Sequence, residues 1–144
     1  MDSATTNSRL YRSVAYALSG LVFIGLLAVF VLPNSSAIEM RNKERQVAVQ
    51  AILDAVYRYS LDTGTAPISI PLASAEICRT NASDCRGLVD LGMLTRDSQY
   101  LREIPVDPKG ASANGTGYWI EKTLAGKVTV EAQGAEGTTI RVGR

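Results

Sequence analysis

The stretch NSSAIEMRNKERQVAVQAILDAVYRYSLDTG, residues 34–64, decides which fold this chain can adopt. Ser36 followed by Glu39 matches a capping box, and Gly64 is typical of the position just past a helix end. Between these signals, apolar residues recur at intervals of three and four, the spacing of one helix face: Val49, Ile52, Val56 and Tyr59. The stretch predicts an amphipathic helix over residues 34–62, with Arg45, Asp54, Arg58 and Asp62 mostly off the buried stripe.

An uncharged run precedes this helix, SVAYALSGLVFIGLLAVFVL, residues 13–32. At about 1.5 Å rise per residue it would span roughly 30 Å, the thickness of the hydrocarbon core of a bilayer. We therefore expect a short tail, 1–12, and a membrane or filament-core helix over 13–33, with a bend permitted at Pro33. The residues expected to form that core are Ala15, Ser19, Gly20, Leu21, Phe23, Ile24, Gly25, Leu27, Phe30 and Pro33.

A cleaved secretory signal is the alternative interpretation of this run. The stretch Ser35-Ser36-Ala37 resembles a signal peptidase site. However, the run is longer than the roughly 7–15 residues of a signal's apolar region. The length therefore favours a retained anchor.

The C-terminal part has the pattern of a small sheet. GYWIEKT and KVTVEA alternate as strands do, with LAG as a turn between them, and TTIRV follows as a third strand. One face of such an antiparallel sheet must be covered, and the stripe of the 34–62 helix is the long apolar surface available. We expect an α+β fold whose head, residues 63–144, is a three-stranded antiparallel sheet packed on that helix. Its inward residues would be Ile120, Val128, Val130 and Ile140.

Cys78 and Cys85 are spaced for a disulfide across a short polar loop. Six residues between them do not match the C-x-x-C spacing of redox or metal motifs. Because disulfides persist in oxidising compartments, the pair predicts that the head lies outside the cytoplasm. Two free thiols are the alternative. The Lys and Arg residues on the two sides of the uncharged run do not decide its orientation.

Composition disfavours several functional classes. The chain has no histidine, which excludes a histidine-based triad and removes the commonest general base. Lys and Arg number 15 against 14 Asp and Glu, so no overall basic charge predicts nucleic acid binding. We expect neither an enzyme nor a cofactor. Asn81-Ala82-Ser83 and Asn114-Gly115-Thr116 fit the N-glycosylation pattern, which also occurs often by chance.

Two stretches carry a family resemblance. RNKERQVAVQAILDAVYRYSLDTGTAP (41–67) resembles the outer half of the pilin helix in small type IV pilins and major pseudopilins. YLREIPVDPKG followed by GTGYWI (100–110 and 115–120) resembles the proline-rich lead into the first strand of the same proteins. The N-terminus departs from the family. No glycine lies in residues 1–12 and no carboxylate in 13–32, so the glycine–aromatic–x-x-x–glutamate site of pilins is missing.

The resemblance implies a structural subunit of a surface filament of the type IV pilus kind. Such a subunit would be held in the cytoplasmic membrane by one span, with its head outside, before it joins the filament. Its partners would be membrane lipid, the pilus assembly machinery and copies of itself, packed through their N-terminal helices. The alternative is a membrane-anchored, extracytoplasmic binding module, or a pseudopilin that forms no long filament.

The resemblance also makes Asp107 a calcium candidate. In some pseudopilins the matching loop binds calcium, and Asn114 and backbone carbonyls could add the several oxygens that this ion requires. A solvated turn aspartate is the simpler interpretation of Asp107. We expect no other metal site.

Overall fold

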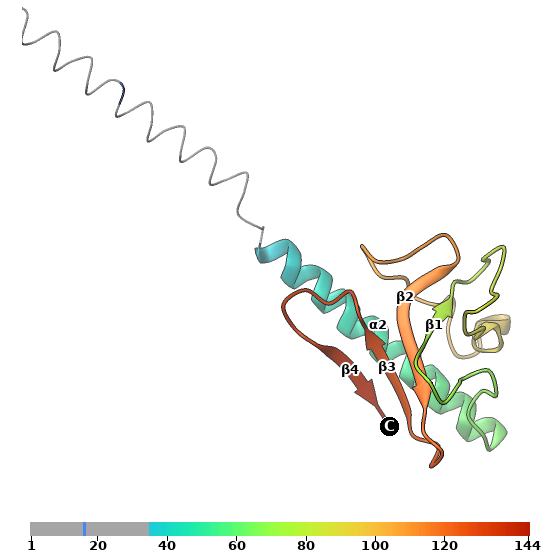
Figure 1. Cartoon of the computed structure of the whole chain (residues 1–144). Helices are drawn as coiled ribbons and strands as arrows, with labels where there is room; N and C mark the ends of the chain where they lie inside the picture. Colours follow the sequence, from blue (N-terminus) through green and yellow to red (C-terminus); the bar gives the residue numbers. More distant parts are fainter. Residues whose placement is uncertain (1–15, 17–34) are drawn as a thin grey trace, which may run out of the picture. The chain divides into compact units, whose positions relative to one another are not determined.

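The computed structural model describes residue 16 and residues 35–144, of which Ser36–Arg144 form a compact unit (Figure 1). In chain order this unit contains helix α2 (Ser35–Thr63), strand β1 (Ala75–Cys78), the 3-10 helices η1 (Gly92–Leu94) and η2 (Arg96–Ser98), and strands β2 (Gly115–Lys122), β3 (Val128–Ala132) and β4 (Ile140–Gly143). Apart from Tyr16, the predicted 13–33 segment and all its expected core residues lie outside the described residues. Among residue 16 and residues 35–144, no helix combines the length and the apolar character needed to cross a membrane.

Helix α2 has nearly the predicted bounds. It ends where Gly64 adopts a left-handed conformation, with φ of +80°, and the Gly64 amide donates to the Ser60 carbonyl at 2.8 Å. Glycine adopts this conformation without the steric cost that a side chain would bring. The glycine therefore ends the helix and turns the chain toward the sheet.

The sheet has four antiparallel strands in the order β1-β2-β3-β4, so the prediction of three strands was wrong. The missed strand is β1, which pairs Ala75 with Ile120 and is irregular between Glu76 and Cys78. Four residues, half of them polar or small, have no recognisable alternation. Their strand conformation depends on pairing with β2, a partner distant in the sequence.

Helix α2 lies along one face of the sheet, as Figure 1 shows. Val49, Ile52 and Val56 are almost completely buried and belong to one core with the sheet residues predicted to face inward, which are Ile120, Val128, Val130 and Ile140. Burial of each such side chain contributes about 1.5–3 kcal/mol. Tyr59, the last residue of the stripe, is only partly buried and packs edge-on against Tyr100, with ring centroids 5.6 Å apart.

The connection from β1 to β2 completes the core. Residues 79–114 carry no strand, yet Val89, Leu91, Leu94 and Ile104 are buried against the same cluster. An isolated parallel bridge joins Ile77 to Val89. The connection is therefore a packed part of the head in which short exposed arcs alternate with buried residues.

Candidate functional site

The most distinctive group of side chains lies in the first half of α2, where Arg45 is fully buried. Its exposed fraction is 0%, although the sequence pattern favoured a place off the buried stripe. Arg45 precedes Val49 by four residues and so extends the stripe by one helical turn. A buried guanidinium needs a partner for its charge and its N–H groups.

That partner is Asp107, in the loop before β2. The Arg45 Nε atom donates to Asp107 Oδ2 at 2.6 Å, and Nη2 donates to Oδ1 at 3.1 Å. The amides of Lys109 and Gly110 donate to the same Oδ1, at 2.8 and 2.6 Å. Asp107 is itself only 3% exposed, so this is a buried, two-pronged ion pair.

Glu136, in the loop between β3 and β4, adds a second carboxylate. It accepts from Arg41 Nε at 2.7 Å, from Arg45 Nη1 at 3.2 Å and from Lys109 Nζ at 3.3 Å. Asn42 bonds the backbone of Glu136 in both directions, through Nδ2 to the carbonyl and through Oδ1 from the amide. The network of Arg41, Asn42, Arg45, Asp107 and Glu136, called the clasp below, joins α2 to two loops of the sheet.

The clasp is organised to keep its carboxylates charged. Burial would raise the pKa of Asp107, but the Arg45 guanidinium and the two backbone amides outweigh it and hold that pKa below its usual range. The hydrogen bond from Arg41, with further donors from Arg45 and Lys109, lowers the pKa of Glu136 to about 2. Both carboxylates are therefore ionised at neutral pH and act as acceptors, not as proton donors.

This arrangement disfavours a calcium site at Asp107. Both of its oxygens already accept hydrogen bonds, and a guanidinium already balances its charge. Nor is it the solvated turn aspartate of the simpler interpretation, because it is buried. Asn114 instead accepts a hydrogen bond from Ser83. In the part of the chain that the structure describes, no three Cys, Asp or Glu side chains are grouped to hold a metal ion.

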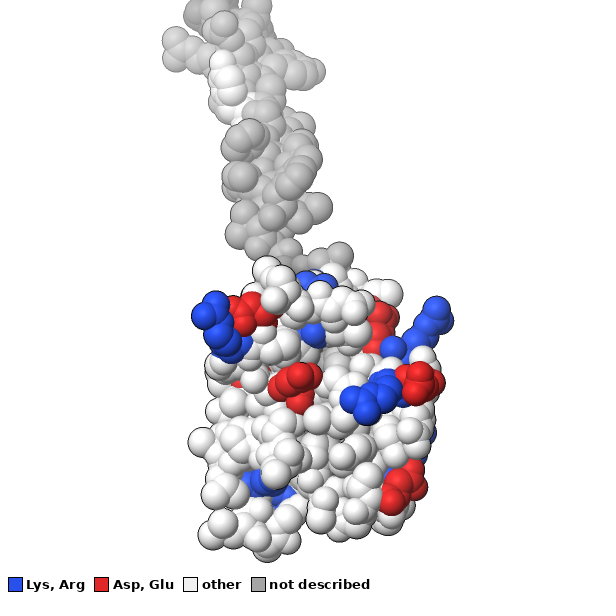
Figure 2. Space-filling view, turned by 90° about the vertical axis from the view of Figure 1, so that its right-hand side faces the viewer, with Lys and Arg blue, Asp and Glu red and all other residues white. Residues whose placement is uncertain are grey.

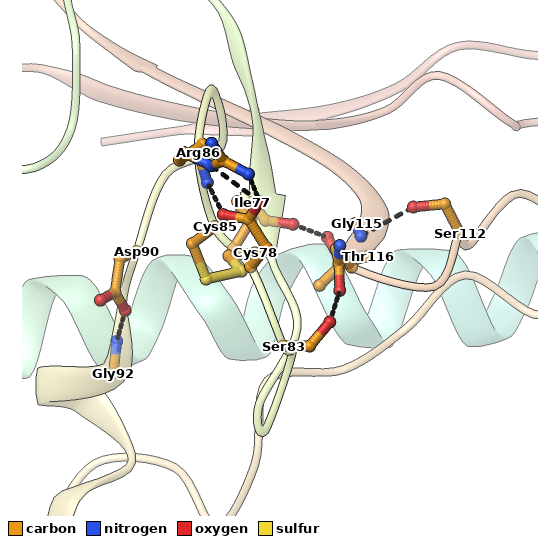
Figure 3. Close-up of a disulfide and its surroundings, with 12 residues drawn as sticks. Ile77, Cys78, Ser83, Cys85, Arg86, Asp90, Gly92, Ser112, Gly115 and Thr116 are labelled. Atoms are coloured by element: carbon orange, nitrogen blue, oxygen red, sulfur yellow. Dashed lines mark hydrogen bonds and ion pairs between the residues drawn. A yellow bond between two sulfur atoms is a disulfide. The ribbon is translucent and has the colours of Figure 1, made fainter.

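The structure joins Cys78 and Cys85 by a disulfide, with Cα atoms 5.6 Å apart (Figure 3). Cys78 is the last residue of β1 and is buried, whereas Cys85 lies in the loop that follows. On the loop side of the bridge, Arg86 bonds Asp84 through both its backbone amide and its side chain. The bridge therefore fixes a polar loop to the edge of the sheet.

Two parts of the surface of the head carry charges of both signs. On the face shown in Figure 2, acidic and basic side chains occur singly or in small groups of both signs. The outer side of the sheet carries a similar arrangement, in which Arg141 bonds both Glu121 and Glu131 across three strands. These ion pairs stabilise local structure. On the face shown in Figure 2, the charged side chains form no extended patch of one sign.

The sequence missed the clasp, although one signal for it was present. The positions 45, 49, 52, 56 and 59 follow one spacing of four and three, so the stripe pattern includes an arginine.

The chain matches no protein-family model, no curated protein and no solved structure.

Proposed function

We propose that this chain is a structural subunit of a surface filament of the type IV pilus kind. Copies would pack through their apolar 13–32 segments, with the heads on the outside. Before assembly the subunit would be held in the cytoplasmic membrane by that segment. Such a role needs no catalytic group, and it fits a polar network whose groups are all engaged with one another.

The observation that carries this proposal is that the helix following the apolar run is also the core of the head. Only two residues, Pro33 and Asn34, separate the run from the first residue of α2. A binding module that moves freely on its membrane anchor would need a flexible linker, such as one rich in glycine and serine. Here the head has no separate core, because Val49, Ile52 and Val56 of α2 cover its sheet.

Exposed apolar side chains on α2 give further support. Met40 and Val47 are 64% and 70% exposed and line a groove of about 500 Å³ together with Val106. Apolar groups left in water on a helix are a reason to seek a partner surface. In a filament, the partner is a neighbouring copy of the same chain.

The clasp fits a subunit that bears load. A pull on the N-terminal end of α2 would reach the sheet through the helical turn between Arg41 and Arg45, in the first half of the helix. Their bonds to Asp107 and Glu136 connect that turn to the sheet through two separate loops. The head would therefore resist peeling from its helix.

Electron microscopy of surface material tests the proposal. Cells that produce the chain are sheared, and antibodies raised against residues 36–144 are used to label what is released. Filaments decorated along their length are expected. Absence of labelled filaments, with the chain found only in the membrane fraction, would favour the anchored module instead.

Two glycine substitutions test whether the apolar runs drive assembly. Gly20→Leu and Gly25→Leu enlarge small positions that would let helices approach closely. We expect both to leave the chain in the membrane with a folded head and to reduce filament yield, whereas Gly20→Ala is the matched control and keeps it. Normal filaments in both leucine variants would contradict packing through residues 13–32.

A further inference from the structure

The loop closed by the disulfide contains a sequence pattern for modification of an asparagine. Residues 80–83 form its tip, and Asn81-Ala82-Ser83 has the N-x-Ser pattern of N-glycosylation. Asn81 and Ser83 are both exposed. The tip is a tight turn in which the Ala82 amide donates to the Arg79 carbonyl at 3.2 Å, and Asn81 has a φ of 61°.

The second pattern of this kind in the head provides an internal contrast. In Asn114-Gly115-Thr116, the threonine has an exposed fraction of 0%. Its Oγ1 donates to the Ile77 carbonyl at 3.0 Å and accepts from the Tyr118 amide at 3.1 Å. An enzyme that must contact the asparagine amide and the hydroxyl together cannot reach this threonine while the head is folded.

Ser83, in contrast, can be reached. Its hydroxyl makes one exposed hydrogen bond, to Asn114 Oδ1 at 3.2 Å, and Figure 3 shows Ser83 on the loop beyond the disulfide. A third match to the pattern, Asn34-Ser35-Ser36, has its asparagine outside the described residues. Of the two patterns that lie wholly within residues 35–144, the one at Asn81 alone presents both of its functional groups to solvent.

We propose that Asn81 is the acceptor of an N-linked glycan. The disulfide supports this independently of the pattern. A Cys78–Cys85 bond indicates an oxidising compartment, and the N-x-Ser/Thr pattern is a glycan acceptor on surface loops of secreted proteins. The disulfide also keeps the turn at the surface, because it ties both ends of the loop to β1.

The chemistry requires a glycan donor, whose class is an oligosaccharide linked to a polyprenyl diphosphate. The Asn81 Nδ2 atom forms a bond to the anomeric carbon of the first sugar as the bond from that carbon to the diphosphate oxygen breaks. Nδ2 gives up one proton to a base of the transferase, and polyprenyl diphosphate leaves with the bonding electron pair. No group is oxidised or reduced.

Mass spectrometry of the full chain, isolated from its own cells, tests the proposal. Trypsin is expected to cut after Arg79 and Arg86, which leaves the reduced peptide Thr80–Arg86 with Asn81 as its single amide side chain. We expect this peptide to carry a glycan on Asn81 and the peptide containing Asn114 to carry none. An unmodified Thr80–Arg86 peptide, or a glycan at Asn34 or Asn114 instead, would overturn the proposal.

Two substitutions at Ser83 separate recognition of the pattern from effects on folding. Ser83→Ala removes the hydroxyl and should abolish the modification, whereas Ser83→Thr keeps the pattern and should retain it. Asn81 itself is left intact in both variants, so its left-handed turn is preserved. Equal modification of the two variants, or a sugar attached through Ser83 oxygen, would also contradict N-linkage directed by this pattern.

Discussion

Helix α2 holds the sheet in two different ways, one helical turn apart. From Val49 to Val56 it presents aliphatic side chains to the strands, and at Arg45 it presents a charge to Asp107. Apolar burial supplies free energy but has little directional preference. A two-pronged guanidinium–carboxylate pair adds little net stability, since desolvation offsets its attraction, yet it demands one geometry. We infer that the aliphatic turns make the head stable and that the clasp sets the register of the helix on the sheet.

The test with the largest expected effect places a charge among the aliphatic side chains of α2. Val56→Asp loses the burial of valine and leaves an unpaired carboxylate under the sheet, a combined cost of about 5 kcal/mol or more. Since small domains are stable by only about 5–15 kcal/mol, we expect a head that is largely unfolded by circular dichroism and digested by protease. Val47→Asp makes the same change at an exposed position of the same helix and should leave the head folded. Protease resistance of the Val56→Asp variant would mean that the stripe does not carry the core.

The second test removes the clasp in two steps. Arg45→Met leaves Asp107 buried without its partner and should cost roughly 3–5 kcal/mol in urea unfolding. Arg45→Met combined with Asp107→Leu removes both charges and should recover most of that loss. Lys43→Met, at an exposed position two residues earlier, is the control. A double variant as unstable as the single one would show that the ion pair itself stabilises the head.

The double variant also tests register. If the clasp sets the position of α2 on the sheet, the amide NMR spectrum of the double variant should show broadened or doubled signals for β2 and α2, although its stability is regained. A spectrum as sharp as that of the unsubstituted chain would assign register to the aliphatic turns alone.

A third test removes the disulfide, which is separate from both the aliphatic turns of α2 and the clasp. Loss of the Cys78–Cys85 bond through a double Cys→Ser change should cost about 2–3 kcal/mol, as expected for closure of a short loop. Thermal unfolding with and without reductant measures the same difference. Labelling of both cysteines by an alkylating reagent in the unreduced, denatured chain would contradict the disulfide.

The smallest expected effect is on pH dependence, and it should come from the clasp. The folded pKa of Glu136 is about 2, below the ordinary value of 4.5, so the unfolded chain binds the proton more readily. The contribution of Glu136 is therefore complete above about pH 5 and is lost as pH falls from about 4.5 toward 2. Asp107, whose pKa is also lowered, should act in the same direction.

Melting temperatures measured between pH 7 and pH 2 provide the check. Glu136→Gln should lower the melting temperature at pH 7 and flatten its decline in acid. Glu39→Gln, which alters an exposed carboxylate paired with Lys43, should keep the original slope. An unchanged slope in the Glu136 variant would show that this carboxylate contributes nothing specific.

The sequence predicted those parts of the fold that depend on local pattern. Helix α2 was placed within one residue at each end, because its apolar period and its terminal glycine lie within the helix or next to it, although Ser36, the predicted cap, is the second helical residue. The three segments with a strand pattern, around Ile120, Val130 and Ile140, are strands. Strand β1 was missed because its register depends on Gly115 to Ile120, far along the chain.

The clasp was missed for a different reason. Arg45 follows the spacing of the buried stripe, but arginine is rarely buried, so residue type outweighed position. Asp107 gave no sign of its partner, since nothing local to the Val106–Pro108 turn indicates a guanidinium. A charged residue in register with an apolar stripe is therefore a reason to search the loops for an opposite charge.

The connection between β1 and β2 has a consequence for how this surface could diverge. The chain leaves the sheet at Cys78 and returns beside it at Gly115, which pairs with Cys78. Between them, the buried residues Val89, Leu91, Leu94 and Ile104 divide the connection into arcs with fixed ends. Doubling the length of such an arc costs only about 0.6 kcal/mol in closure entropy. Each arc could therefore acquire insertions and new epitopes separately, without a change in the frame that carries them.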